Sequence, residues 1–132
     1  MNIVFEEPLK FSLDVAEIDE NSATIKLNLD VEISQFNQRI SYNGSFWLSL
    51  ENLKSFKETI FHREDSTLTD IEGYFSFEIK NYNSSRALHW KNIRRDLTGN
   101  RQVEILFSAS LDADSFERIR SGFIELQSFF DS

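Results

Sequence analysis

Alternation of apolar and polar residues is the clearest pattern in the first third of the chain. Apolar residues occupy every odd position from Ala23 to Ile33, and polar residues occupy every even position between them. Residues 9–15 show the same period of two, which is typical of strands with one buried and one solvated face. The polar segment 17–22 separates the two runs, so we expect an antiparallel hairpin.

The same alternation continues beyond the hairpin. It predicts further strands over residues 35–48, 68–82, 88–90 and 103–107. Segment 42–45 interrupts the first of these, and Gly44 within it is expected to mark a β-bulge.

Apolar spacings of three and four predict two helices. The first covers about 50–60, with Ser49 as its N-cap residue and Glu51 in the first turn, where the helix dipole favours a carboxylate. The second begins at Asp112 or Asp114 and carries one apolar stripe, formed by Phe116, Ile119, Phe123, Leu126 and Phe130.

These elements predict an α+β fold in a single domain over residues 1–132. We expect one antiparallel sheet of about six to seven strands, with both helices packed on its apolar face. Ile25 and Leu27 should then point into the core. The 132 residues are 40% hydrophobic and 14% aromatic, which suits one folded core, and the absence of cysteine excludes disulfides and cysteine-ligated metals.

Charge is distributed unevenly along the chain. The net charge is −8, but residues 86–101 carry five basic residues against Asp96 alone and net +4, so the remainder nets −12. An acidic chain disfavours binding to nucleic acid, and the arginines of 86–101 are expected to neutralise acidic neighbours on adjacent strands. The N-terminus shows no signal peptide and no window is long enough to span a membrane, so we expect a cytoplasmic protein without membrane or nucleic-acid partners.

Candidate catalytic groups are few. His62 falls where the first helix should end and His89 falls within a predicted strand, so structural roles are the simpler interpretation of both. The usual nucleotide, zinc-protease, hydrolase and calcium motifs are absent from the sequence. We therefore expect no catalytic residue, no metal and no cofactor.

Three aromatic residues fall on the phase opposite the predicted core face. Trp47, Tyr74 and Tyr82 should point outward, whereas most of the thirteen phenylalanines fall on core positions. Outward aromatics either pack against one another across strands or form the apolar centre of a partner interface. The sequence leaves both possibilities open.

The order of elements from about Phe11 to Leu126 resembles a known family. Segment 41–48 (SYNGSFWL) runs into the first helix, and segment 72–79 (EGYFSFEI) begins the second group of strands before the final helix. In these features the chain resembles the WapI-type immunity proteins of bacterial polymorphic and contact-dependent toxin systems. It departs from them after Ser84, where a glycine-started strand would be expected and residues 85–90 (SRALHW) stand instead.

The resemblance implies a function. Members of that family are small cytoplasmic antitoxins that bind and neutralise a cognate toxin domain, often a nuclease, so a toxin domain is the implied partner. A basic toxin would be attracted by the acids of the first strand pair and its turn, with outward tyrosines as anchors, and the candidate partner-binding residues are Asp14, Glu17, Asp19, Glu20, Asp30, Glu32, Tyr74 and Tyr82.

Other interpretations stay open at this point. The acids can equally form a solubilising surface. A small-molecule-binding or accessory domain would require a concave apolar pocket, where the phenylalanine-rich faces do not close completely. An enzyme would require convergent titratable groups in a cleft, for example two carboxylates beside His89.

Overall fold

The computed structural model describes the backbone of residues 2–131 and the side chains of residues 2–126. Phe130, assigned above to the stripe of the second helix, lies outside the described side chains. The elements in chain order are β1 (Asn2–Phe5), β2 (Lys10–Asp19), β3 (Thr24–Gln35), β4 (Gln38–Ser49), α1 (Leu50–Phe61), β5 (Ser66–Thr69), β6 (Phe75–Tyr82), β7 (Ser85–Arg95), β8 (Gln102–Leu111) and α2 (Ala113–Asp131).

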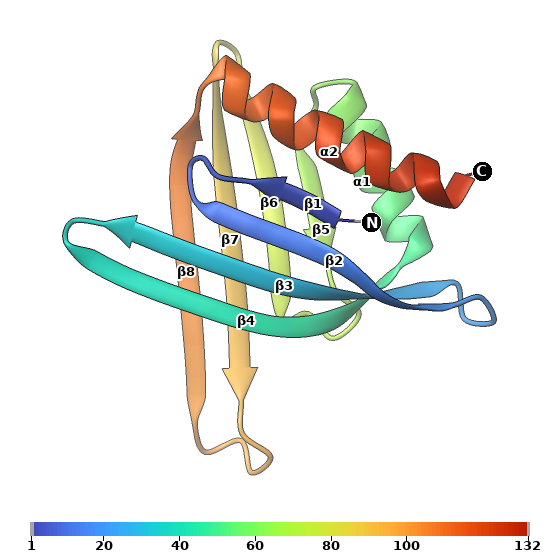
Figure 1. Ribbon diagram of the computed structural model, residues 1–132, viewed down its shortest axis with the longest axis vertical. Coiled ribbons are helices and arrows are strands. Elements are labelled where there is room, and N and C mark those ends of the chain that lie inside the picture. Colours follow the sequence, from blue (N-terminus) through green and yellow to red (C-terminus); the bar gives the residue numbers. More distant parts are fainter. Residues whose placement is uncertain (1, 132) are drawn as a thin grey trace.

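The eight strands form two separate sheets, so the predicted single sheet is wrong, whereas the α+β class and both helices are confirmed. One sheet has the order β1-β2-β3-β4 and the other the order β5-β6-β7-β8, with every neighbouring pair antiparallel. Each sheet is followed directly by a helix, and α1 carries the chain from the first sheet to the second. The strands of the two sheets cross at a steep angle, and both helices lie on one side of the crossing (Figure 1).

The first sheet follows the predicted alternation closely. Ile25 and Leu27 are fully buried, as expected from their phase. The bulge predicted at Gly44 is wrong, because β4 pairs with β3 without a register shift and Gly44 lies opposite Leu29. The irregularity falls instead in β2, between Val15 and Glu17.

Gly44 instead leaves room for two side chains that lie directly against its backbone. A Cβ atom at this position would lie 2.9 Å from Nη2 of Arg94 and 2.9 Å from the hydroxyl oxygen of Tyr42. Any larger residue would therefore displace one of these two side chains, which reach the position from β7 and from β4 itself.

The helix starts agree with the sequence. The hydroxyl of Ser49 accepts a hydrogen bond from the backbone N–H of Asn52 at 3.0 Å, which confirms Ser49 as the N-cap of α1. The carboxylate of Asp112 accepts from the N–H of Ser115 at 2.7 Å, so Asp112 caps α2, while Asp114 lies in its first turn.

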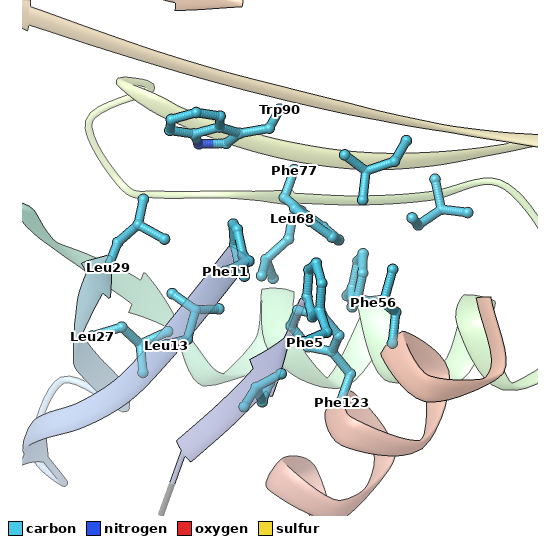
Figure 2. Close-up of a cluster of buried hydrophobic side chains, with 14 of the residues drawn as sticks. Phe5, Phe11, Leu13, Leu27, Leu29, Phe56, Leu68, Phe77, Trp90 and Phe123 are labelled. Atoms are coloured by element: carbon cyan, nitrogen blue, oxygen red, sulfur yellow. The ribbon is translucent and has the colours of Figure 1, made fainter. Parts of the chain in front are cut away.

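Aromatic side chains from both sheets and both helices meet in one core (Figure 2). The ring of Phe77, on β6, lies 5.1 Å from the ring of Phe11 on β2 and 5.6 Å from that of Phe123 on α2. It also contacts the rings of Phe5 and Phe56. Phe77 thus joins the two sheets and the two helices at a single point.

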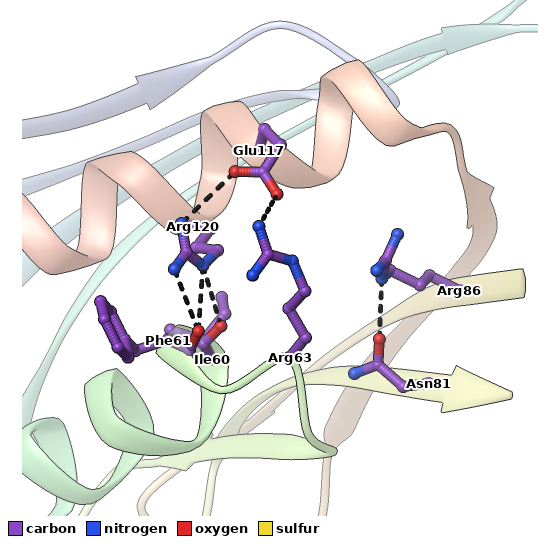
Figure 3. Close-up of polar contacts among 7 residues, drawn as sticks. All are labelled: Ile60, Phe61, Arg63, Asn81, Arg86, Glu117 and Arg120. Carbon is purple, nitrogen blue, oxygen red and sulfur yellow. Dashed lines mark hydrogen bonds and ion pairs between the residues drawn. The ribbon is translucent and has the colours of Figure 1, made fainter. Parts of the chain in front are cut away.

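Arg120 ties the two helices together outside this core (Figure 3). Its guanidinium donates to the carbonyl of Phe61 at 3.0 Å and to that of Ile60 at 3.3 Å, at the end of α1 where carbonyls lack helical partners. Glu117 holds the guanidinium from α2 at 3.4 Å and also accepts from Arg63 at 3.0 Å.

Candidate functional site

The acids predicted on the strand pair lie on the outer face of the first sheet, where cations partly neutralise them. Glu32 forms an ion pair with Arg39 at 2.6 Å and lies opposite Lys10 in the β2–β3 register. Asp30 is exposed and lies between Ser12 of β2 and Asn43 of β4. Asp14 is half-buried between polar neighbours. This face is therefore less negative than the sequence alone indicates.

The β2–β3 turn retains more of its negative charge. Asp19 and Glu20 are exposed there, while Glu17 lies 4.0 Å from Lys26. The side chain and the backbone N–H of Ser22 donate to Asp19 and lower the pKa of its carboxyl group, so this charge persists to more acidic pH. Of the predicted acids, Asp19 and Glu20 form the clearest negative site.

The outward tyrosines do not join the acids. Tyr74 precedes β6, and the centre of its ring lies 6.0 Å from the guanidinium carbon of Arg95. Tyr82 is exposed at the β6–β7 turn, on the second sheet. The structure thus distributes the eight predicted residues over the outer face of one sheet, a turn at its end, and two places on the other sheet.

The basic segment 86–101 is not neutralised as predicted. Of its five cations, only Lys91 forms an ion pair with a carboxylate within the described residues, at 3.6 Å from Glu104. Arg86 instead donates to Asn81 at 2.8 Å and covers the ring of Phe116, as Figure 3 shows in part. Arg94 donates to the backbone carbonyl of Asn43, and Arg95 donates to the side-chain oxygen of Gln102. A net positive charge therefore persists at the β7–β8 turn, where Arg94, Arg95 and Arg101 outnumber Asp96.

A hollow of 720 Å³ lies between one end of the first sheet and the β7–β8 pair. Its apolar lining includes Phe11, Val31 and Ile105. Two of the predicted acids, Asp30 and Glu32, also line it, and the rest of its polar lining includes Tyr42, Asn92 and Arg94. The last three also line a second hollow of 580 Å³, beside Trp47 and Tyr74. The phenylalanine-rich faces therefore do not close completely at this end.

A chain of hydrogen bonds supports the wall of this hollow. The indole N–H of Trp90 donates to the Asn92 side-chain oxygen at 2.8 Å, and the Asn92 amide donates to the Tyr42 hydroxyl at 3.0 Å. Because that hydroxyl accepts from Asn92, its own proton is available to a ligand. Asn92 is buried, and a polar residue on the apolar phase of its strand is the signal that sequence reasoning missed.

The nearest approach to a catalytic arrangement is on the outer face of the second sheet. Nδ1 of His89 lies 2.8 Å from the hydroxyl of Ser108 on β8, and Glu78 is the register partner of His89 on β6. Glu78 is engaged by Thr67 at 3.2 Å and by Lys80 at 3.7 Å. The two carboxylates that a catalytic role for His89 would require are not found among its partners in the described part of the chain. His62 is the exposed C-cap residue of α1.

No family model, curated protein or solved structure matches the chain. Within the described residues, no three potential ligands among His, Asp and Glu converge on a metal position. None of the described helices has the length and apolar character needed to cross a membrane.

Proposed function

We propose that this chain is an immunity-type protein that binds and neutralises a cognate toxin domain in the cytoplasm. The observation that carries the proposal is the pair Asp19 and Glu20, which project from the first sheet in an acidic chain without a cationic partner among the described residues. A basic, nuclease-type toxin would be attracted to such a turn from a distance, because opposite charges accelerate encounter and orient the approach.

The geometry of the turn favours this role over a purely solubilising one. Hydrogen bonds from the backbone N–H groups of Ser22 and Asn21, at 3.3 and 3.0 Å, fix the orientation of the Asp19 carboxylate. A fixed charge loses less conformational entropy on binding than a mobile one. Asp14, Asp30 and Glu32 would then extend the interface along the outer face.

The test uses the C-terminal domain of a toxin encoded beside this chain, co-expressed with it. The wild-type chain should restore growth and bind that domain directly. Asp19→Lys combined with Glu20→Lys should slow association by about tenfold at low salt and reduce its salt dependence, since the steering field is removed. Stopped-flow association rates across a salt series would measure both effects.

A matched control separates the turn from overall charge. Glu58→Lys combined with Glu125→Lys changes the net charge equally, at exposed positions on the two helices. This variant should keep most of the wild-type association rate. Equal slowing in both double variants would exclude the turn from the interface, and a chain that neither binds the toxin nor restores growth would refute the proposal itself.

The hollow favours a second candidate function, the binding of a small molecule. A volume of 720 Å³ lies within the usual range of ligand pockets, which is about 300–1,000 Å³. Phe11, Val31 and Ile105 would contact an apolar body, while the Tyr42 hydroxyl and the Arg94 guanidinium would bind an acceptor or anionic group. Because Asp30 and Glu32 also line the hollow, the implied ligand is a small amphipathic molecule whose polar end carries hydrogen-bond acceptors for Tyr42 and Arg94 without a large negative charge.

Native mass spectrometry of the purified protein tests this candidate. We expect the protein to retain a bound ligand as an added mass, and Ile105→Trp should reduce the bound fraction because the larger ring occupies part of the apolar wall that the ligand would contact. The same variant should restore growth against the toxin as well as the wild type does, which separates the two functions. A protein that carries no ligand mass, or an unchanged bound fraction in Ile105→Trp, would contradict ligand binding in this hollow.

A further inference from the structure

The terminal strand β8 has one edge without a partner in the described chain. It pairs with β7 on one side, over ten residues from Gln102 to Leu111. Its side chains are unusually apolar for such a position, since Val103 is 61% exposed and Leu106 is 69% exposed, and Glu104 is its only charged residue. A long, apolar, exposed edge is what soluble proteins normally avoid, because it offers a row of free N–H and C=O groups.

The other three terminal strands are protected. β1 and β5 have only four residues each. β4 is long, but its edge is covered in part, because the Arg94 side chain donates to the carbonyl of Asn43 at 2.8 Å and the N–H of Ile71 donates to that of Trp47 at 2.9 Å. Short strands and charged covers are common protections of sheet edges. β8 has neither.

We infer that β8 pairs with β8 of a second copy of this chain, in an antiparallel arrangement around a two-fold axis at Leu106. The two second sheets would then form one continuous sheet. In this register Leu106 faces its own counterpart, Phe107 faces Ile105 of the other copy, and Glu104 faces Ser108. The pairing joins aromatic with β-branched side chains and places no like charges opposite each other, and both features favour cross-strand pairs.

The charges at the two ends of β8 support a second copy as the occupant. Arg94, Arg95 and Arg101 outnumber Asp96 at its start, and Asp112 and Asp114 outnumber Arg86 at its end. Antiparallel pairing brings the basic end of one copy beside the acidic end of the other, twice by symmetry. With the axis at Leu106, Arg101 lies opposite Leu111 of the other copy, next to Asp112. The strand is thus electrostatically complementary to itself.

The first sheet would also cover the added strand. The tip of the β3–β4 hairpin projects past β8 (Figure 1). Near this tip, Ile33 of β3 is paired with Ile40 of β4, and both side chains lie on the inner face of the first sheet. Ile40 is nevertheless 44% exposed. A strand added beside β8 would lie below this projecting end and bury its apolar side chains. The inference is independent of the proposed function.

Sedimentation velocity of the full chain tests the inference. We expect a monomer–dimer equilibrium between about 1 and 100 µM, as for a small interface. Leu106→Lys should weaken the dimer at least about tenfold, because two ammonium groups would meet at the axis. Arg101→Glu should also weaken the dimer, because it removes the attraction between Arg101 of one copy and Asp112 of the other. High salt should weaken the dimer as well, because it screens this attraction. The matched control is Val4→Lys, at a 60% exposed apolar position on the terminal strand of the other sheet, which should dimerise like the wild type.

Disulfide trapping tests the register. The chain has no cysteine, so a single introduced thiol reports only on its own position. Paired residues of antiparallel strands have Cα atoms about 4.5–5.5 Å apart, which a disulfide can span. Leu106→Cys should therefore form a covalent dimer under mild oxidation. Ser110→Cys should not, because it faces Gln102 of the other copy, but it should cross-link in a mixture with Gln102→Cys.

Several outcomes would overturn the inference. A monomer over the whole concentration range would do so, and so would a dimer that Leu106→Lys leaves intact or that Val4→Lys weakens equally. Efficient cross-linking of Ser110→Cys with itself would reject the axis at Leu106. A monomer whose β8 becomes protected from hydrogen exchange only on binding the toxin domain would assign this edge to that partner instead.

Discussion

Leu27→Asp should leave the chain unfolded. Leu27 is fully buried in the middle of β3, between Val15 of β2 and Phe46 of β4. A carboxylate there would lose its hydration without gaining a partner, at a cost of more than about 4–5 kcal/mol. Since small domains are stable by only about 5–15 kcal/mol, the circular dichroism spectrum at 25 °C should lose its native signal.

The neighbouring position provides the control. Asn28→Asp adds the same charge one residue further along β3, on the exposed outer face. The new carboxylate faces Asp14 of β2, and this like-charge pair should cost no more than about 1 kcal/mol, so Asn28→Asp should still melt within a few degrees of the wild type. If Leu27→Asp melted like Asn28→Asp, the assignment of the two faces of β3 would be incorrect.

These two residues illustrate what the sequence could predict. Alternation identifies the buried face of a strand, because neighbouring residues point to opposite sides, and it placed Ile25 and Leu27 in the core. Local chemistry was equally informative at Ser49, where a hydroxyl before an apolar run correctly marked the start of α1. Both signals depend only on near neighbours in the chain.

The division into two sheets depends on contacts that alternation does not encode. A period of two indicates which face of a strand is buried, but it does not indicate which strands are hydrogen-bonded to each other. β1 was missed because it has only four residues and its three apolar residues, Ile3, Val4 and Phe5, follow one another without a period of two. The segment 68–82 was expected to be strand, but it forms β5 and β6 around a turn at Gly73, which has a φ of 79°.

The candidate site shows the same limit. The acidic character of the β2–β3 turn was evident from sequence, since Asp19 and Glu20 are adjacent and need no distant partner. The hollow at Tyr42 and Asn92 was not, because these residues are 50 positions apart and their hydrogen bond exists only once the two sheets pack together. Partial neutralisation of the outer face by Arg39 also follows from register and not from composition.

Phe77→Ala should destabilise both sheets together by about 3–5 kcal/mol, the usual cost of removing a buried aromatic ring. Phe77 is fully buried and contacts rings from β1, β2, α1 and α2. Each sheet alone buries one face only, so neither should stay folded once this shared contact is lost. We therefore expect one cooperative transition, shifted to lower denaturant concentration.

The two tryptophans can test this cooperativity, because Trp47 belongs to β4 in the first sheet and Trp90 to β7 in the second. Single-tryptophan versions, made with Trp47→Phe or Trp90→Phe, would report on one sheet each, and Phe77→Ala should shift both transitions by the same amount relative to its own parent. Tyr82→Ala, at an exposed position on the same strand, is the control and should shift neither by more than about 0.5 kcal/mol. Two transitions that separate in Phe77→Ala, with the first sheet unfolding at an unchanged denaturant concentration, would show that the sheets fold independently and that the ring contacts around Phe77 do not couple them.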